Sequence, residues 1–428
     1  MVVLSRMSNK EESVGVIWQP MCKNTRARPY IHKKYIMALE TCIAFLLADE
    51  LDADEYIHVK AKVPFKARKI RDHGKNNYFS DIVPSMSARD FQNYFQLTPT
   101  QVEELVRLLP SCDWAGSTLE GWTMMHAVLS SLWTLSTLES HASIAARFQT
   151  SESLIHQQLQ EFCALVTANF SDKVHWPKWK DAEASVAGFS AAVGLPGTVC
   201  AVGYCLIPIE RPMDVPDSEA YRVSERSYLV NLMAFCNHQG CFTYVSAKHP
   251  GNWHNSRVLL DTEVGRALQQ DPVSLLRGKH IIGDSTFPLS EHLLTPFPDH
   301  GTLGEKKRRY NLKVQAALQV VRGSLHSLRC RFQRLKLLQM NSVAQTSLAV
   351  HTCCILYNMY LETNNAASLE CMEEDFITQM PFHELPTGHS GSLGGISKRQ
   401  DVAASLGRKP KKDGGLKHEQ LQQLGKYW

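Results

Sequence analysis

The chain has 428 residues, of which 44% are hydrophobic and 21% are charged, and its formal net charge is +4. This composition is typical of a soluble globular protein with two or three domains and a sizeable core. The sequence contains no run of 18 apolar residues, so it predicts neither a signal peptide nor a membrane span.

The first 88 residues show weak hydrophobic periodicity. A basic patch from Lys60 to Lys75 follows an acidic stretch from Asp49 to Glu55. We predict a poorly ordered arm over residues 1–88, with one short helix near Tyr35–Leu47.

Residues 89–180 have the periodicity of helices. Thr98-Pro99-Thr100 is an N-terminal helix signal, and apolar residues recur at helical spacing near residues 125–136, 144–148 and 155–166. The polar run Thr150–Ser153 supplies capping residues between the last two segments. A short helix, a tight turn and a longer helix predict a helical, helix-turn-helix-like domain. The longer helix has almost no Arg or Lys. The alternative to DNA recognition by this element is therefore that the two helices only pack against each other.

Residues 181–385 change to β-rich patterning. Three apolar runs, the last two joined by a hairpin-type connection at Asn237–Gly240, precede a helical stretch, a short strand and a long helix. Three strands, helix, strand, helix is the order of an RNase H-like α/β domain, which we predict over this range. The predicted elements are Val199–Ile209, Tyr228–Cys236, Cys241–Ala247, Ser256–Gln269, His280–Ile282 and about Val314–Leu335.

The modest net charge hides one strongly basic stretch. Residues 305–336 contain ten basic side chains and one acidic side chain, Glu305, so the remainder of the chain is slightly acidic. This asymmetry predicts a polyanionic partner, namely nucleic acid held by roughly six to ten phosphate contacts, and a solvated helix face is the alternative. The candidate nucleic-acid contacts are Lys306, Lys307, Arg308, Arg309, Arg329 and Arg331.

Residues 386–428 are rich in Gly, Ser, Lys and Gln and contain eight basic and three acidic side chains. We predict a disordered basic tail. Within it, Arg408–Lys412 is a candidate nuclear localisation patch, although short basic runs of this kind are frequent by chance.

The 12 cysteines include no CxxC pair and no Cys/His spacing of the zinc type. In a chain of this length, that pattern predicts reduced thiols in an intracellular compartment. Cys353 and Cys354 are adjacent within an apolar stretch, and we interpret them as small buried hydrophobic residues.

Five short motifs occur in a fixed order between about residues 90 and 360. The most specific is Gly283–Leu289 followed by Leu293–Phe297, which is similar to Gly-Asp-Ser-Gly-Tyr-Pro-Leu and Leu-Leu-Thr-Pro-Tyr of the PIF/Harbinger transposases. The chain therefore resembles the transposase-derived nucleases of that family, which are DDE superfamily endonucleases. The further matching segments are Pro250–Ser256, Tyr310-Asn311, Leu328–Phe332 and Cys354–Asn358.

The resemblance implies an Asp-Asp-Glu triad that holds divalent metal for in-line displacement at a phosphodiester. Asp284 occupies the second position, whereas Gly203 and Arg322 stand where the family has the first Asp and the Glu. Glu210 and Glu305 are poor substitutes, because they lie roughly 23 Å along a strand and roughly 25 Å along a helix from those positions.

These residues predict a domesticated, catalytically degenerate transposase derivative that acts as a nuclear protein- or DNA-binding factor without a cofactor. One alternative is a residual nuclease that uses Mg²⁺ or Mn²⁺ bound through Asp284, and another is a decaying product without a function. A lone Asp after a strand also often does no more than cap the following turn. The resemblance implies a Myb/SANT-domain partner, non-specific nucleic acid as a second partner and no membrane. We expect the nucleus as the compartment, with the cytoplasm as a second.

The charge reversal at the third triad position leads to one structural prediction. Arg is always charged and presents a fork of donors that suits a carboxylate. We therefore predict that Arg322 pairs with Asp284, directly or through one water, and that Gly203 leaves room for the longer side chain.

Overall fold

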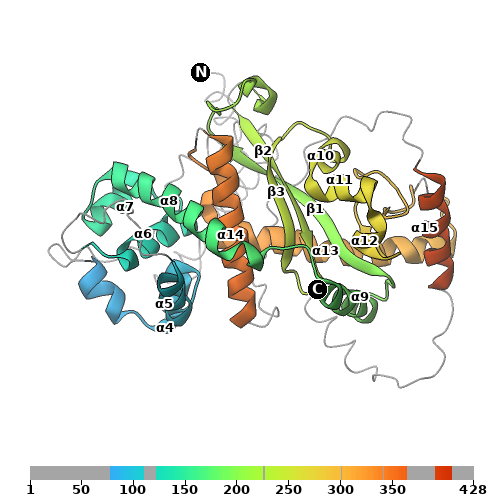
Figure 1. Ribbon diagram of the computed structural model, residues 1–428, viewed down its shortest axis with the longest axis horizontal. Helices are drawn as coiled ribbons and strands as arrows, with labels where there is room; N and C mark the ends of the chain where they lie inside the picture. Colours follow the sequence, from blue (N-terminus) through green and yellow to red (C-terminus); the bar gives the residue numbers. More distant parts are fainter. Residues whose placement is uncertain are drawn as a thin grey trace, which may run out of the picture. The chain divides into compact units, whose positions relative to one another are not determined.

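Figure 1 shows the computed structural model, which describes residues 78–109, 122–224, 227–299, 301–340, 342–363 and 391–406. All of these residues lie within one unit of the chain, Phe65–Trp428. The helix predicted near Tyr35–Leu47 and the basic patch Arg408–Lys412 fall outside the described residues. Among the helices that are described, none is long and apolar enough to cross a lipid bilayer.

The N-terminal part of the described chain is helical, as the periodicity predicts. Helix α5 begins with a capping box, in which Thr98 and Gln101 satisfy each other's backbone donors and Pro99 follows the cap. Serine caps start α7 and α8, and Gln149 takes a left-handed conformation at φ 55° to make the turn between them. The elements are η1 (Tyr78–Ile82), η2 (Val83–Ser85), α4 (Ala88–Phe95), α5 (Pro99–Leu108), α6 (Met124–Ser136), α7 (His141–Phe148), α8 (Glu152–Phe170) and η3 (Ser171–Lys173).

The assignment of residues 1–88 to a poorly ordered arm is wrong for residues 78–88. Tyr78 is buried, and its ring packs edge-on against Trp133 at 5.6 Å and Phe148 at 5.7 Å. The large apolar area of these rings holds the segment in place without any local periodicity, because the partners are distant in the sequence.

Four strands follow the predicted order, and a fifth, β5, which was not predicted from the sequence, completes one sheet with the order β3-β2-β1-β4-β5. Strand β1 pairs antiparallel with β2 and parallel with β4, and Gly240 at φ 80° closes the β2–β3 hairpin turn. The elements of this part are α9 (Trp179–Ala192), β1 (Thr198–Ile209), η4 (Ser218–Tyr221), β2 (Tyr228–Cys236), β3 (Phe242–Pro250), β4 (His280–Ile282), β5 (Leu293–Leu294), α13 (Glu305–Arg331), η5 (Gln333–Lys336) and α14 (Val343–Thr363).

The helix predicted over Ser256–Gln269 is two helices, α10 (Asn255–Asp261) and α11 (Glu263–Gln270), followed by α12 (Pro272–Leu276). Thr262 divides them, because its hydroxyl donates to the Leu259 carbonyl and accepts from the Gly265 amide, which starts a new helix. The apolar spacing alone does not reveal this break.

The alternation of side chains along β1 separates two apolar clusters on the two faces of the sheet. Ala201, Cys205 and Ile207 join a cluster with α13 and α14, whereas Cys200 and Val202 join a second cluster with α10 and α11. Helix α14 packs against both α8 and β3, so the first cluster continues from the sheet into the helical part (Figure 1). Cys353 and Cys354 lie fully buried in it, which confirms their interpretation as small apolar residues.

The predicted disordered tail over 386–428 contains a helix, so that prediction is wrong for the residues described here. Helix α15 (Leu393–Ser405) packs against α13 and β5, and Gly395 approaches the Ser290 backbone too closely to tolerate a Cβ atom. Its Lys398 donates to the Gly278 and Lys279 carbonyls, and its Arg399 donates to the Pro296 carbonyl. Long-range hydrogen bonds from basic side chains thus order a segment whose composition predicts disorder.

Candidate functional site

Asp284 lies directly after β4, where the motif predicts a catalytic carboxylate. Gly283 precedes it because a Cβ there would come within about 3.1 Å of Phe287, Leu293 and Val202. The Asp284 Oδ1 atom accepts hydrogen bonds from the Thr286 amide at 2.9 Å and the Thr286 hydroxyl at 2.5 Å. The carboxylate therefore stabilises the turn that follows its own strand.

Two buried asparagines extend this hydrogen bond into the sheet. The Asn255 amide donates to the Thr286 hydroxyl at 2.7 Å, and the Asn231 amide donates to Asn255 Oδ1 at 3.0 Å. Both asparagines are fully buried, and Asn231 Oδ1 has no hydrogen-bond partner in the described part of the chain. Asn231 stands opposite Leu206 on β1. The network thus runs in one direction from β2 to Asp284, with every N–H or O–H donating toward the carboxylate.

Gly203 lies in the middle of β1 on the face that α13 covers. A Cβ at this position would meet the two methyl groups of Val321 at 3.0 and 3.1 Å and Leu325 at 3.7 Å. The prediction that Gly203 leaves room for Arg322 is therefore wrong, because the Val321 side chain takes that space.

Arg322 lies one residue further along α13 and is exposed. Its guanidinium donates to Gln315 Oε1 at 3.2 Å, and it forms no ion pair with Asp284 within 4.0 Å. The direct pair that we predicted is thus absent, because Arg322 pairs along its own helix and Asp284 pairs within its own turn.

The charges of Asp284 and Arg322 both influence the pKa of the Tyr204 hydroxyl. Burial, followed by the nearby Asp284 carboxylate, raises the pKa of Tyr204 to about 12, while a hydrogen bond with Asn255 and the Arg322 charge oppose the shift. Tyr204, Asn255 and Asp284 therefore form one cluster next to the end of β4, and the charge of Arg322 acts on it from α13. Sequence reasoning missed Tyr204 and Asn231, and the alternation of faces along β1 and β2 is the signal that could have placed them beside Asp284.

This cluster is a poor fit to a divalent metal ion. Mg²⁺ prefers carboxylate oxygens in near-octahedral geometry, whereas the cluster offers one carboxylate, Asp284, and the positive charge of Arg322 also acts on its Tyr204 hydroxyl. The Asn255 amide uses its oxygen and its nitrogen in the buried network. Across the described ranges, no three or more His, Cys, Asp and Glu side chains are placed to hold a metal ion.

Comparison with known proteins finds a family match that covers this part of the chain. Residues 202–358 match the DDE superfamily endonuclease family. The chain carries a DDE superfamily endonuclease domain. It is similar to Putative nuclease HARBI1 of Mus musculus, with 28% identity over 45% of this chain and 54% of that protein. It is also similar to Protein ALP1-like of Arabidopsis thaliana, with 24% identity over 52% of this chain and 57% of that protein.

The chain thus spans little more than half the length of these two relatives. No solved structure matches it.

Two asparagines of the family motifs hold the DDE domain together. Asn311 on α13 accepts from the Phe297 amide and donates to the Phe297 carbonyl, at 2.8 Å each, which joins two motif segments. Asn358 on α14 binds the backbone of Phe242 in the same two-sided way, at 2.9 and 2.8 Å. Such paired bonds satisfy the backbone N–H and C=O groups of Phe297 and Phe242, so these motif positions have a structural role.

The predicted nucleic-acid contacts of the DDE domain divide into two groups along α13. Lys306, Lys307, Arg308 and Arg309 are all exposed in its first turns. Arg309 pairs with Glu305, Arg308 donates to the Leu303 carbonyl, and the Lys307 ammonium lies over the Phe297 ring. Four cations at a helix N-terminus also add to the positive end of the helix dipole, which produces a strongly positive surface.

Arg329 and Arg331 are not available for such contacts, and the prediction is wrong for both. Arg329 is 4% exposed, so a phosphate does not reach it. The Arg331 guanidinium stacks over the Tyr360 ring at 3.3 Å and donates to Gln96 on the helical side. Arg334, a third member of the basic stretch, is also buried, at 2% exposure.

Proposed function

We propose that this protein is a nuclease-domain derivative that no longer cleaves phosphodiesters and instead binds nucleic acid through the exposed cations of α13. The placement of Arg322 carries the proposal. Arg322 occupies the position where the resembling family has its third carboxylate, and its charge acts on the same Tyr204 hydroxyl as the charge of Asp284, so a guanidinium there would repel a metal ion.

The sheet order supports an RNase H-like fold for this domain. Three antiparallel strands, β1 to β3, are followed by two parallel strands on the other side of β1, and Asp284 follows β4. Helix α13 then crosses the sheet with Val321 packed on Gly203. The two lost carboxylates and Asp284 would thus belong to adjacent elements of one degenerate site.

The expected result of a cleavage assay is no nicking of supercoiled plasmid by the purified full chain in Mg²⁺ or Mn²⁺. A single carboxylate does not hold the two metal ions that stabilise the attacking and leaving oxygens of an in-line displacement. Metal-dependent nicking that Asp284→Asn abolishes, and that the matched variant Asp299→Asn retains, would favour the residual nuclease instead. Asp299 is a suitable control because, among the described residues, its carboxylate accepts from the nearby Gly301 amide.

Binding to duplex DNA is expected to be independent of sequence and to depend steeply on salt. With about four phosphate contacts, affinity should fall roughly a hundredfold between about 50 and 200 mM salt. The double variant Lys306→Ala/Arg308→Ala should make the slope of log K against log salt shallower by about 1.8.

The matched control for this measurement is Arg211→Ala/Arg222→Ala, which removes the same charge from two exposed arginines that pair with Glu219. Fluorescence anisotropy at several salt concentrations provides the slopes. Equal slopes for the two double variants would contradict a role for the first turns of α13.

The nuclear compartment and a Myb/SANT-domain partner are further parts of this proposal, and they rest on the family resemblance. DNA reading by α7 and α8 also stays a prediction. Affinity purification from nuclei, with identification of the co-purifying proteins, is the experiment for the partner.

A further inference from the structure

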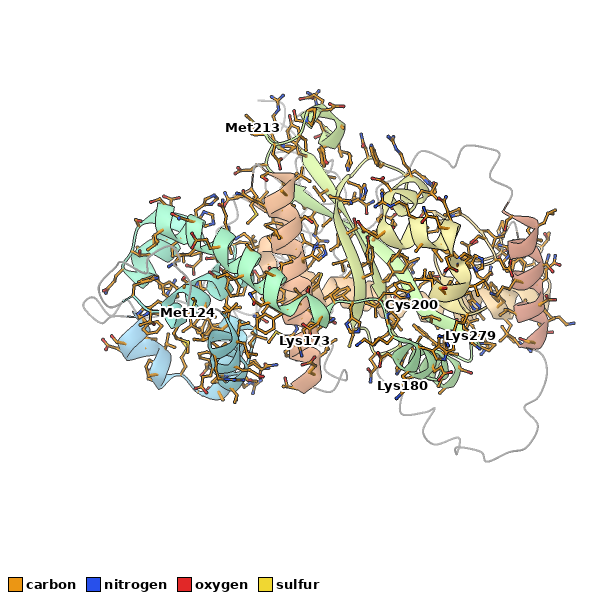
Figure 2. All side chains as sticks on the ribbon, in the orientation of Figure 1. Met124, Lys173, Lys180, Cys200, Met213 and Lys279 are labelled. Carbon is orange, nitrogen blue, oxygen red and sulfur yellow. The ribbon has the colours of Figure 1, made fainter. Side chains whose placement is uncertain are left out.

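A groove of 410 Å³ lies away from the Asp284 cluster, between the start of α9 and the corner of α11 and α12. In Figure 2, Lys180 marks α9 and Lys279 marks the segment just after α12. Its volume falls in the range of small-molecule sites, roughly 300–1,000 Å³. The lining residues that matter here are Trp176, Lys178, Trp179, Asp271, Ser274 and Arg277.

Two indole rings provide the flat apolar part of the groove. Trp176 is anchored in the sheet, because its ring packs edge-on against Phe235 at 5.7 Å. The Trp179 ring, on the first turn of α9, lies under the Arg277 guanidinium at 4.7 Å. Because Arg277 covers one face of the Trp179 ring, a planar ligand would stack on the indole surface that Arg277 leaves uncovered.

The polar groups that line the groove are mostly hydrogen-bond donors without acceptors. Trp176 Nε1 is buried and has no partner in the part of the chain that the structure describes. No acceptor in that part is recorded for the Lys178 ammonium or the Arg277 guanidinium either. The Asp271 carboxylate, by contrast, already caps α12 through the Ser274 amide at 3.1 Å. The groove therefore suits a ligand that is anionic, rich in acceptors and partly planar.

Arg277 reaches the groove from an unusual backbone conformation. It ends α12 at φ 45° and ψ 49°, the left-handed region that favours glycine. A bulky residue that holds such a conformation at a binding groove is a reason to look for a function.

We propose that this groove binds a nucleotide, with the base against the indole rings and the phosphate against Lys178 and Arg277. A phosphate is an acceptor-only anion and matches the unpaired donors. An extended peptide fits less well, because its own amide donors would find few acceptors in the groove. This site is separate from the α13 surface, so the proposal does not rest on backbone binding there.

The ligand could be a free nucleotide or an unpaired nucleotide within a strand. The experiment is isothermal titration calorimetry of the full-length chain with thymidine monophosphate and, separately, with a short oligothymidylate. Trp179→Ala should weaken binding about tenfold to a hundredfold, the usual range for loss of one base–aromatic stack.

Arg277→Gly is the sharper variant, because glycine adopts the left-handed conformation freely and the fold should keep its melting temperature while nucleotide binding falls. The matched control is Arg257→Ala, which removes a guanidinium stacked on Trp253 at 3.6 Å outside the groove and should leave binding unchanged.

Binding of both probes supports the proposal with a free nucleotide as ligand, and binding of the oligothymidylate alone supports it with a strand as ligand. The proposal is overturned if neither probe binds, or if binding survives both Trp179→Ala and Arg277→Gly. Binding of an acidic proline-rich peptide in place of either nucleotide probe would also overturn it.

Discussion

Gly203→Asp, which places a carboxylate where the resembling family has its first Asp, is expected to destabilise the protein by about 3–5 kcal/mol, the order of an uncompensated buried charge. The new side chain would point at Val321 and Leu325, and even its Cβ would lie 3.0 Å from a Val321 methyl group. An ionised carboxylate in that apolar contact has no hydrogen-bond donor. Urea denaturation of the variant and the parent chain provides the two free energies of unfolding.

Two glycine controls separate the contributions to this effect. Gly203→Ala adds only the Cβ and should cost about 1–3 kcal/mol through overpacking. Gly323→Ala, on α13 where a Cβ meets nothing within 4 Å, should stabilise the protein by about 0.5–1 kcal/mol. If Gly203→Asp is instead as stable as the parent chain and gains stability in Mn²⁺, the site still binds metal. The proposal that the catalytic site is degenerate would then be wrong.

Arg334→Ala is the second change for which we expect a large effect, a loss of about 2–4 kcal/mol of stability, since it leaves buried carbonyl groups without donors. Arg334 Nε donates to the Thr134 carbonyl at 3.0 Å, and Nη2 donates to the Glu139 carbonyl at 2.5 Å. Thr134 lies in the last turn of α6, so the cation also stabilises the negative end of that helix dipole. Burial lowers the pKa of Arg334 to about 10, and the charge of Glu139 opposes that shift.

The comparison for Arg334 is Arg331→Ala, which removes a neighbouring guanidinium that stacks on Tyr360. That stack is worth about 0.5–2 kcal/mol, so the control should lose clearly less stability. The midpoints of urea denaturation decide between the two variants. Equal midpoints would mean that Arg334 does not join the helical part to the DDE domain.

Local sequence signals predicted the order of elements well. Strand β2 was predicted with its observed bounds, and β4 likewise, because an apolar run between turn residues has few other local conformations. The caps of α5, α7 and α8 follow from Thr and Ser at positions where a side chain satisfies a free amide. The motif around Asp284 identified the candidate site for a similar reason, since its residues are contiguous in the chain.

Only the tertiary structure decided which charged residues are exposed. Arg322, Arg329 and Arg334 belong to one basic stretch of the sequence, yet the first is exposed and the other two are buried. Their environments depend on which elements cover α13 and η5, and those elements come from distant parts of the chain. The neighbours of Asp284 are set in the same way, because Tyr204 and Asn231 reach it through strand register. Hydrophobic periodicity in the sequence indicates which helix or strand a residue belongs to. The burial and the charge pairing of its side chain depend on what packs against that helix or strand.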